Sequence, residues 1–216
     1  MRPPARHCSG GVPWRPEYHR GRSDCGTLTP MLVDPLRSAQ DGLPPWAVVT
    51  AARREHIERV VTLMRGWVTA LRLPAEERAR WLRAVWLHDA LRDAPEAEMR
   101  RWAPHVDGPV ELRHGPAAAA RAELEGERDA DVLSAVRWHS VGWVGWGRIG
   151  RALYCADFLE PGRAFDRADR AALAVRYPEE PDAVLRSVVS CRLEYALTQG
   201  WTLPQESLAF RAALLG

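Results

Sequence analysis

Apolar residues recur every three or four positions along most of the chain after residue 45, which is the spacing of one helical face. Val49, Ala52, Val60, Leu63 and Trp67 share one such face, and the run ends before a proline at position 74. The same criteria predict helices over residues 46–72, 75–92, 96–102, 116–125, 129–140, 148–160, 166–176, 181–199 and 204–215. Because no series of alternating apolar and polar residues predicts strands, the expected fold class is all-α.

The first 44 residues lack this periodicity and are rich in proline, glycine, serine and arginine. We therefore expect an irregular or disordered segment over residues 1–44 and one domain over residues 45–216. Two histidines and two cysteines in the segment suggest a metal-binding tail, but their spacing matches no zinc template. These residues are His7, Cys8, His19 and Cys25. An alternative is that Met31 is the true first residue and the preceding residues are a misassigned extension.

The charge of the chain gives little reason to expect nucleic-acid binding. Residues 1–44 hold six arginines and four acidic residues, whereas residues 45–216 hold 24 of each. The absence of lysine and asparagine is typical of GC-rich codon use, so the abundance of arginine carries no functional signal. No stretch approaches the roughly 20 apolar residues of a membrane helix, and no secretory signal is evident. With four widely spaced cysteines, a cytoplasmic protein with reduced thiols and no membrane partner is expected.

Histidines and aspartates interrupt the apolar faces of several predicted helices. The residues concerned are His56, His88, Asp89, His139 and Asp157, with His114 at the start of a further helix. One buried histidine is usually a hydrogen-bonded core residue, but six such groups on separate helices satisfy one another best by converging. Imidazole and carboxylate groups suit first-row divalent metals, and six of them suffice for two ions that share one carboxylate. Asp89 is the expected bridge, and two-metal sites of this kind hydrolyse phosphoesters or phosphoanhydrides.

The letters around these residues resemble the motifs of the HD-domain metal phosphohydrolases. The segments "RREHIERV", "WLHDALRD", "LRHGPAAA", "VRWHSVG" and "YCADFLEPGRAF" are similar to R-x-x-H-x-x-x-V, H-D-x-x-K, H-G/A, H-T-x-G and A-D-aromatic-x-E-P-x-R. Together they resemble the YqeK-type family, bacterial symmetrical diadenosine tetraphosphate (Ap4A) hydrolases with a bimetal iron centre. The resemblance covers about residues 46–200 and implies an HD-domain helical bundle with a bimetal site in its core.

The resemblance also implies an activity and a role for each matching residue. The activity is that of a symmetrical bis(5'-nucleosyl)-tetraphosphatase, which cleaves Ap4A into two ADP with a metal-activated water. One divalent ion would be held by His56, His88, Asp89 and Asp157, and the other by Asp89, His114 and His139. Iron is the implied metal, with manganese, cobalt, magnesium or zinc as alternatives. Asp89 and Arg92 are the implied catalytic residues, and Arg53, Arg92, Arg163 and Ser140 the implied substrate-binding residues.

Two residues depart from the family pattern. Arg92 stands where the family has lysine, and Ser140 stands where it usually has threonine. Neither change removes an expected metal ligand. For the three arginines a carboxylate partner or a solvated position is the alternative to phosphate binding, and for Arg53 we favour that alternative. Hydrolysis of another nucleotide or phosphate ester, or nucleotide binding without catalysis, is the alternative function, and a homodimer stays open.

Several residues near these motifs are also informative, and most of them have two interpretations. Trp138, Trp143 and Trp146 either stack on an adenine or pack in the core and on the surface, and the large number of tryptophans favours packing. Glu160 is expected either to hydrogen-bond a ligand histidine or to pair with an arginine three residues later. Cys155 is expected in the core.

Overall fold

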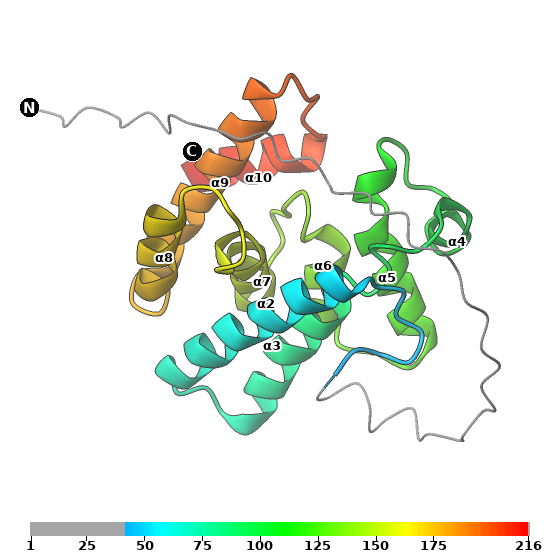
Figure 1. Ribbon diagram of the computed structural model, residues 1–216, viewed down its shortest axis with the longest axis horizontal. Coiled ribbons are helices and arrows are strands. Elements are labelled where there is room, and N and C mark those ends of the chain that lie inside the picture. Colours follow the sequence, from blue (N-terminus) through cyan, green and yellow to red (C-terminus); the bar gives the residue numbers. More distant parts are fainter. Residues whose placement is uncertain (1–41, 216) are drawn as a thin grey trace, which may run out of the picture.

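The computed structural model describes residues 42–215, which fold into α-helices joined by short loops (Figure 1). The described residues contain no strand, and this confirms the predicted all-α fold. The helices are α2 (Ala51–Ala70), α3 (Ala75–His88), α4 (Glu96–Trp102), the 3-10 helix η1 (Val110–Leu112), α5 (His114–Leu124), α6 (Ala130–Trp138), α7 (Arg148–Leu159), α8 (Arg167–Arg176), α9 (Pro181–Thr198) and α10 (Gln205–Leu215).

The predictions made for the leading segment lie outside the described residues, except at residues 42–44. This applies to the division of the chain near residue 44 and to the alternative start at Met31. It also applies to the metal-binding tail predicted from His7, Cys8, His19 and Cys25. These therefore stay predictions.

Helix α7 occupies the centre of the bundle, in contact with α2, α3 and α6 as well as α8 and α9 (Figure 1). Helix α5 packs between α6 and α4, and α10 packs on α9. The core between these helices is made of fully buried apolar side chains such as Ile57, Val60, Trp81, Val85 and Leu153. The predicted polar residues lie on, or directly after, five of these helices. These five helices, α2, α3, α5, α6 and α7, therefore pack around a single core.

Local sequence explains where three of the helices begin. The Thr50 side chain accepts a hydrogen bond from the backbone N–H of Arg53 at the start of α2, and the Asp129 carboxylate accepts two at the start of α6. Both are N-caps, which satisfy amide groups that lack a partner inside the helix. Helix α3 begins after Pro74 with two glutamates in its first turn, where negative charge is favourable. The starts of α3 and α6 lie within one residue of those predicted from the sequence, whereas the start of α2 does not.

Two predicted helix boundaries are wrong, and they share one cause. Helix α2 begins at residue 51 rather than 46, and α3 ends at His88 rather than near Arg92. The backbone of Val48 donates to the carbonyl of Ala90 and accepts from the N–H of Asp93. The Asp93 carboxylate also accepts hydrogen bonds from the backbone and side chain of Thr50. This pairing between segments distant in sequence accompanies the non-helical backbone of residues 47–50 and the turn after α3.

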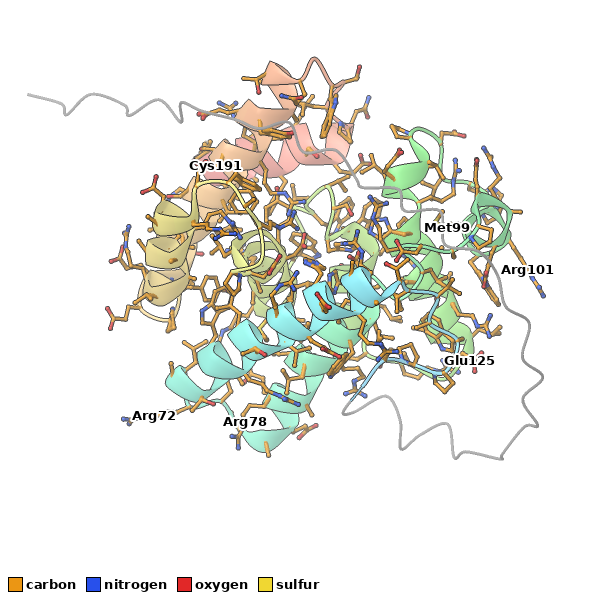
Figure 2. All side chains as sticks on the ribbon, viewed as in Figure 1. Arg72, Arg78, Met99, Arg101, Glu125 and Cys191 are labelled. Atoms are coloured by element: carbon orange, nitrogen blue, oxygen red, sulfur yellow. The ribbon has the colours of Figure 1, made fainter. Side chains whose placement is uncertain are left out.

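Many charged side chains project from the outside of the bundle. Figure 2 labels four of them, Arg72, Arg78, Arg101 and Glu125, and all four are exposed. Over residues 42–215, no helix is both long enough and apolar enough to cross a membrane.

Candidate metal centre

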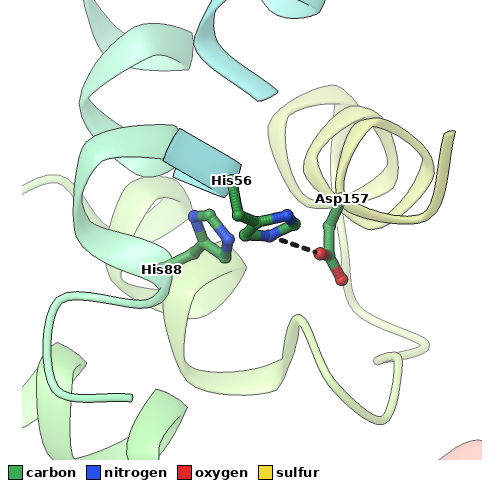
Figure 3. A group of neighbouring side chains, drawn as sticks. All are labelled: His56, His88 and Asp157. Atoms are coloured by element: carbon green, nitrogen blue, oxygen red, sulfur yellow. Dashed lines mark ion pairs between the residues drawn. The ribbon is translucent and has the colours of Figure 1, made fainter. Parts of the chain in front are cut away.

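All six predicted ligands are buried and meet at the centre of the bundle. They are His56 on α2, His88 at the end of α3, Asp89 directly after it, His114 at the start of α5, His139 directly after α6 and Asp157 on α7. Within the described residues they form two groups whose ligand atoms lie within 4.8 Å of one another, one made of His56, His88 and Asp157 and the other of Asp89, His114 and His139. Figure 3 shows the first group, with its side chains projecting from three helices toward a common point.

The Asp89 carboxylate lies between two pairs of histidines. Its Oδ1 atom is 3.0 Å from Nε2 of His114 and 3.4 Å from Nε2 of His139. Its Oδ2 atom is 3.6 Å from Nε2 of His88 and 3.8 Å from Nε2 of His56. Each oxygen therefore faces a different histidine pair, which is the arrangement of a carboxylate able to bridge two ions.

The hydrogen bonds behind the rings orient the histidines. The Nδ1 atoms of His88, His114 and His139 lie 2.6, 2.6 and 2.8 Å from backbone carbonyl oxygens three residues earlier. Because a carbonyl oxygen can only accept, Nδ1 carries the proton in each ring and Nε2 presents its lone pair to the centre. Nδ1 of His56 lies 3.2 Å from the Glu160 carboxylate, which orients that ring in the same way. Partners of this kind are typical of metal-binding histidines.

Two of the four histidine nitrogen atoms that face the centre lack a hydrogen-bond partner within the described residues. Nε2 of His56 and Nε2 of His88 are buried without a hydrogen-bond partner, although His56 Nε2 lies 3.2 Å from Oδ1 of Asp157 (Figure 3). Nε2 of His114 and Nε2 of His139 lie only 3.0 Å apart. Buried lone pairs that face other lone pairs are unfavourable unless a cation lies among them. The residues therefore fit divalent metal ions.

Burial and charge hold four of the ligands, His88, His114, Asp89 and Asp157, in the protonation states that metal binding needs. Burial lowers the pKa of His88 and of His114 to about 4, so both imidazoles are neutral at pH 7. Burial alone would raise the pKa of Asp89, but the attraction of His88, in the protonated form it takes at acid pH, and of Arg53 holds that pKa well below its ordinary value. Asp157 behaves in the same way through Arg163, so its pKa is also lowered. The centre thus combines neutral imidazoles with ionised carboxylates.

The predicted substrate-binding residues surround this centre, although not all in one role. Nη1 of Arg53 donates to Oδ2 of Asp89 over 2.8 Å, so the carboxylate partner that we favoured for this arginine is present. Nη2 of Arg163 donates to Oδ1 of Asp157 over 2.8 Å. The hydroxyl oxygen of Ser140 lies 3.2 Å from Nε2 of His139.

Arg92 lies differently from the other predicted cations. Its Nη1 atom donates to the backbone carbonyl of Glu111 over 3.1 Å, and the same carbonyl oxygen lies behind the His114 ring. Arg92 therefore borders the centre through the segment that holds His114, and no carboxylate pairs with it in the described residues. Its predicted catalytic and substrate-binding roles stay predictions.

The neighbouring residues with two interpretations are now placed. Glu160 contacts the His56 ring and pairs with Arg59 over 2.7 Å, whereas Arg163 lies 4.0 Å away. The histidine partnership that we considered for it is therefore present. Cys155 is fully buried, and burial raises the pKa of its thiol, as expected of a core cysteine.

The three tryptophans near His139 pack against protein. Trp146 belongs to the buried core, and the half-buried rings of Trp138 and Trp143 stack on each other with their centroids 4.9 Å apart. The packing interpretation is the one that the structure supports.

Two arginines at the centre were absent from the sequence-based prediction. Arg59 holds the carboxylate of Glu160, and it lies one turn after His56, so helical spacing could have indicated it. Arg192 on α9 reaches Asp157 from 35 residues further along the chain. No motif surrounds Arg192, and only the packing of α9 on α7 brings it to the site.

Comparison with protein families identifies the class of protein. The HD domain family model matches residues 53–174, which is more than half of the chain and includes all six candidate ligands. The chain belongs to the HD domain family. The family and the two groups of histidines and aspartates together indicate a divalent-metal-binding protein.

Curated relatives with a named activity are similar to part of the chain. The symmetrical bis(5'-nucleosyl)-tetraphosphatase of Bacillus subtilis is 32% identical over 108 residues, 46% of this chain and 58% of that protein. The enzyme of the same name from Halalkalibacterium halodurans is 29% identical over 109 residues, 49% of this chain and 56% of that protein. The chain thus spans little more than half the length of these relatives.

A solved structure supports the fold independently of the sequence. The crystal structure of a predicted HD superfamily hydrolase involved in NAD metabolism from Clostridium acetobutylicum superposes with a TM-score of 0.67 and 20% identity. The match covers 77% of this chain and 90% of that chain. The helical arrangement is therefore that of an HD superfamily protein over most of the described residues.

Proposed function

We propose that this protein is a symmetrical Ap4A hydrolase, which adds one water to the central phosphoanhydride of Ap4A and releases two ADP. The observation that carries the proposal is the position of Asp89, whose two carboxylate oxygens face two separate pairs of buried histidines. The symmetrical tetraphosphatases to which the chain is similar support this choice of substrate. The predicted cytoplasmic location belongs to the same proposal.

In this proposal the six buried ligands hold two divalent ions. His56, His88, Asp157 and Oδ2 of Asp89 would hold one ion, and His114, His139 and Oδ1 of Asp89 the other. When bound, such a pair supplies a hydroxide nucleophile near neutral pH and polarises a phosphoryl oxygen. Iron is the proposed native metal, and imidazole and carboxylate ligands suit manganese, cobalt and zinc as well. Metal analysis of protein purified without oxygen would identify the ion.

The chain's own residues orient the ligands and neutralise the substrate. Backbone carbonyls and Glu160 fix the histidine tautomers, so the rings need no rearrangement before metal binding. The guanidinium groups of Arg53 and Arg163 pair with the carboxylates of Asp89 and Asp157, and their remaining N–H donors would be available to phosphate oxygens. The Ser140 hydroxyl lies next to the His139 ring, where it can donate to a substrate oxygen.

The test is product analysis with the metal-loaded full chain. We expect Ap4A to yield ADP alone, with no cleavage after metal removal by a chelator. ATP plus AMP would contradict symmetrical cleavage, and an inert protein with full metal content would contradict the enzyme proposal. ATP and p-nitrophenyl phosphate are included as representatives of the alternative substrates. If the protein cleaves ATP or p-nitrophenyl phosphate but not Ap4A, the cleaved compound would replace Ap4A as the proposed substrate.

A further inference from the structure

Helix α9 delivers a third guanidinium group to the metal centre, although it lies after residue 174, where the match to the HD domain family ends. Nη1 of Arg192 is 3.5 Å from Oδ2 of Asp157, and Nη2 donates to the backbone carbonyl of Ser140 over 3.2 Å. The guanidinium also lies over the Tyr154 ring, 4.2 Å from its centroid. Arg192 is therefore an addition to the set of residues that the HD motifs define.

These contacts hold the Arg192 guanidinium in place without using most of its hydrogen-bonding capacity. A guanidinium has five N–H donors, and the described hydrogen bonds use two of them, one on each terminal nitrogen. Its separation from Asp157 is 3.5 Å, whereas Arg163 approaches the other oxygen of the same carboxylate to 2.8 Å. The aromatic ring and the carbonyl thus fix its position, while donors remain for an anionic ligand.

The charges around the centre also favour an anion at this place. Within the described residues, the guanidinium groups of Arg53, Arg163 and Arg192 lie within 3.5 Å of two carboxylates, Asp89 and Asp157, and Glu160 is 4.0 Å from Arg163. Glu160 does not restore the balance, because it is paired with Arg59. Two bound divalent ions would increase the positive excess. The three arginine side chains are 24%, 23% and 21% exposed, so a ligand can reach them.

We propose that Arg192 binds a non-bridging phosphate oxygen of the substrate on the side of the centre formed by Asp157 and Ser140. In this way α9 selects polyphosphate nucleotides over substrates with a single phosphate. The inference rests on the proposed function for the identity of the nucleotide, but the binding of a polyphosphate by Arg192 can be tested without turnover.

The experiment compares Arg192→Gln and Arg192→Lys with a matched control, Arg186→Gln, at an exposed position of the same helix. Binding of inorganic tripolyphosphate to the manganese-loaded full chain is measured by calorimetry, and bound metal is measured by elemental analysis. Losing one charge-assisted hydrogen bond predicts a Kd for tripolyphosphate roughly tenfold higher in Arg192→Gln. The lysine variant should be intermediate and the control unchanged, with equal metal content in all four proteins.

Kinetics then assign the effect to the substrate. We expect Arg192→Gln to raise KM for Ap4A by a larger factor than it lowers kcat, and to lower cleavage of p-nitrophenyl phosphate, if the wild type cleaves it, by a smaller factor than cleavage of Ap4A. Equal tripolyphosphate affinity in Arg192→Gln and the wild type would overturn the inference. So would a loss of bound metal in both Arg192 variants, because Arg192 would then only position Asp157. A wild type that binds tripolyphosphate through Arg192 but leaves Ap4A intact would refute the proposed function alone.

Discussion

Asp89 is the residue on which the two halves of the proposed metal centre would depend. Its carboxylate is the one group that approaches all four histidine Nε2 atoms, at 3.0 to 3.8 Å. The sequence predicted this bridging position from the adjacency of His88 and Asp89. The structure explains it by the turn that begins directly after α3, because the turn places the two side chains on the same centre.

The first prediction concerns Asp89→Ala. Removing the carboxylate takes one ligand from each half of the site, so we expect bound metal to fall below one ion per chain. Turnover should fall by at least about a hundredfold, because the water then lacks its activating metals. Elemental analysis and product formation measure the two effects. Asp107→Ala, in an exposed loop, is the matched control and should change neither. Near-normal turnover of Asp89→Ala with full metal content would show that the bridging assignment is wrong.

Some residues of the site could be predicted from the sequence and others could not, and the difference has a physical reason. The six candidate ligands could be predicted because buried polar groups interrupt apolar helical faces, and because their order resembles a known set of motifs. The contact of Arg192 with Asp157 could not, because it depends on how α9 packs against α7. The helix boundaries near residues 51 and 88 could not be predicted for the same reason, because they depend on the tertiary pairing of Val48 with Ala90.

At the scale of elements, Arg170 on α8 ties down the loop that follows α7. Its buried guanidinium donates to the backbone carbonyls of Phe158, Glu160, Arg163 and Phe165. Burial lowers the pKa of Arg170 to about 10, but the group stays charged at pH 7. Since this loop carries Arg163 and begins at Glu160, the hydrogen bonds of one side chain fix two neighbours of the metal centre.

The second prediction is that Arg170→Ala destabilises the protein. The substitution leaves several buried carbonyl groups without donors, so the free energy of unfolding should fall by about 3 kcal/mol. Urea denaturation of the full chain measures the change. Arg167→Ala, at an exposed position of the same helix, should stay within about 0.5 kcal/mol of the wild type. Equal stability of the two variants would contradict the role that we assign to Arg170.

At the scale of the whole molecule, the buried centre makes stability depend on pH. Burial lowers the pKa of His88 and of His114 to about 4 in the folded protein, whereas an unfolded histidine titrates near 6.5. Between these values the unfolded chain binds more protons than the folded chain. Protonation therefore favours unfolding, and the contribution of the two neutral histidines to stability is lost as the pH falls through this window.

Other groups of the centre act in different directions or at lower pH. Burial alone would lower the pKa of His56, but the nearby carboxylates of Asp157 and Glu160 favour the charged ring and raise that pKa. Its contribution is thus largest at low pH and opposes that of the other two histidines. Glu160 has a pKa lowered to about 2, since its hydrogen bonds to His56 and Arg59 outweigh burial, so its contribution is lost only below about pH 4.5. The net loss should therefore begin near pH 6.5 and continue into the acid range.

The third prediction is a sloping stability profile for the metal-free protein. We expect the free energy of unfolding to fall from pH 7 to pH 4, with at most about 3 kcal/mol from each of His88 and His114. Urea denaturation at intervals of half a pH unit, after removal of metal with a chelator, provides the measurement. His88→Gln should flatten the slope even if it lowers stability at pH 7, whereas His105→Gln, at an exposed loop position, should leave the slope unchanged. A flat profile between pH 6.5 and 4 in the wild type would mean that the buried rings do not stay neutral. The same protons compete with metal for the Nε2 atoms, so metal affinity should decline over the same range of pH.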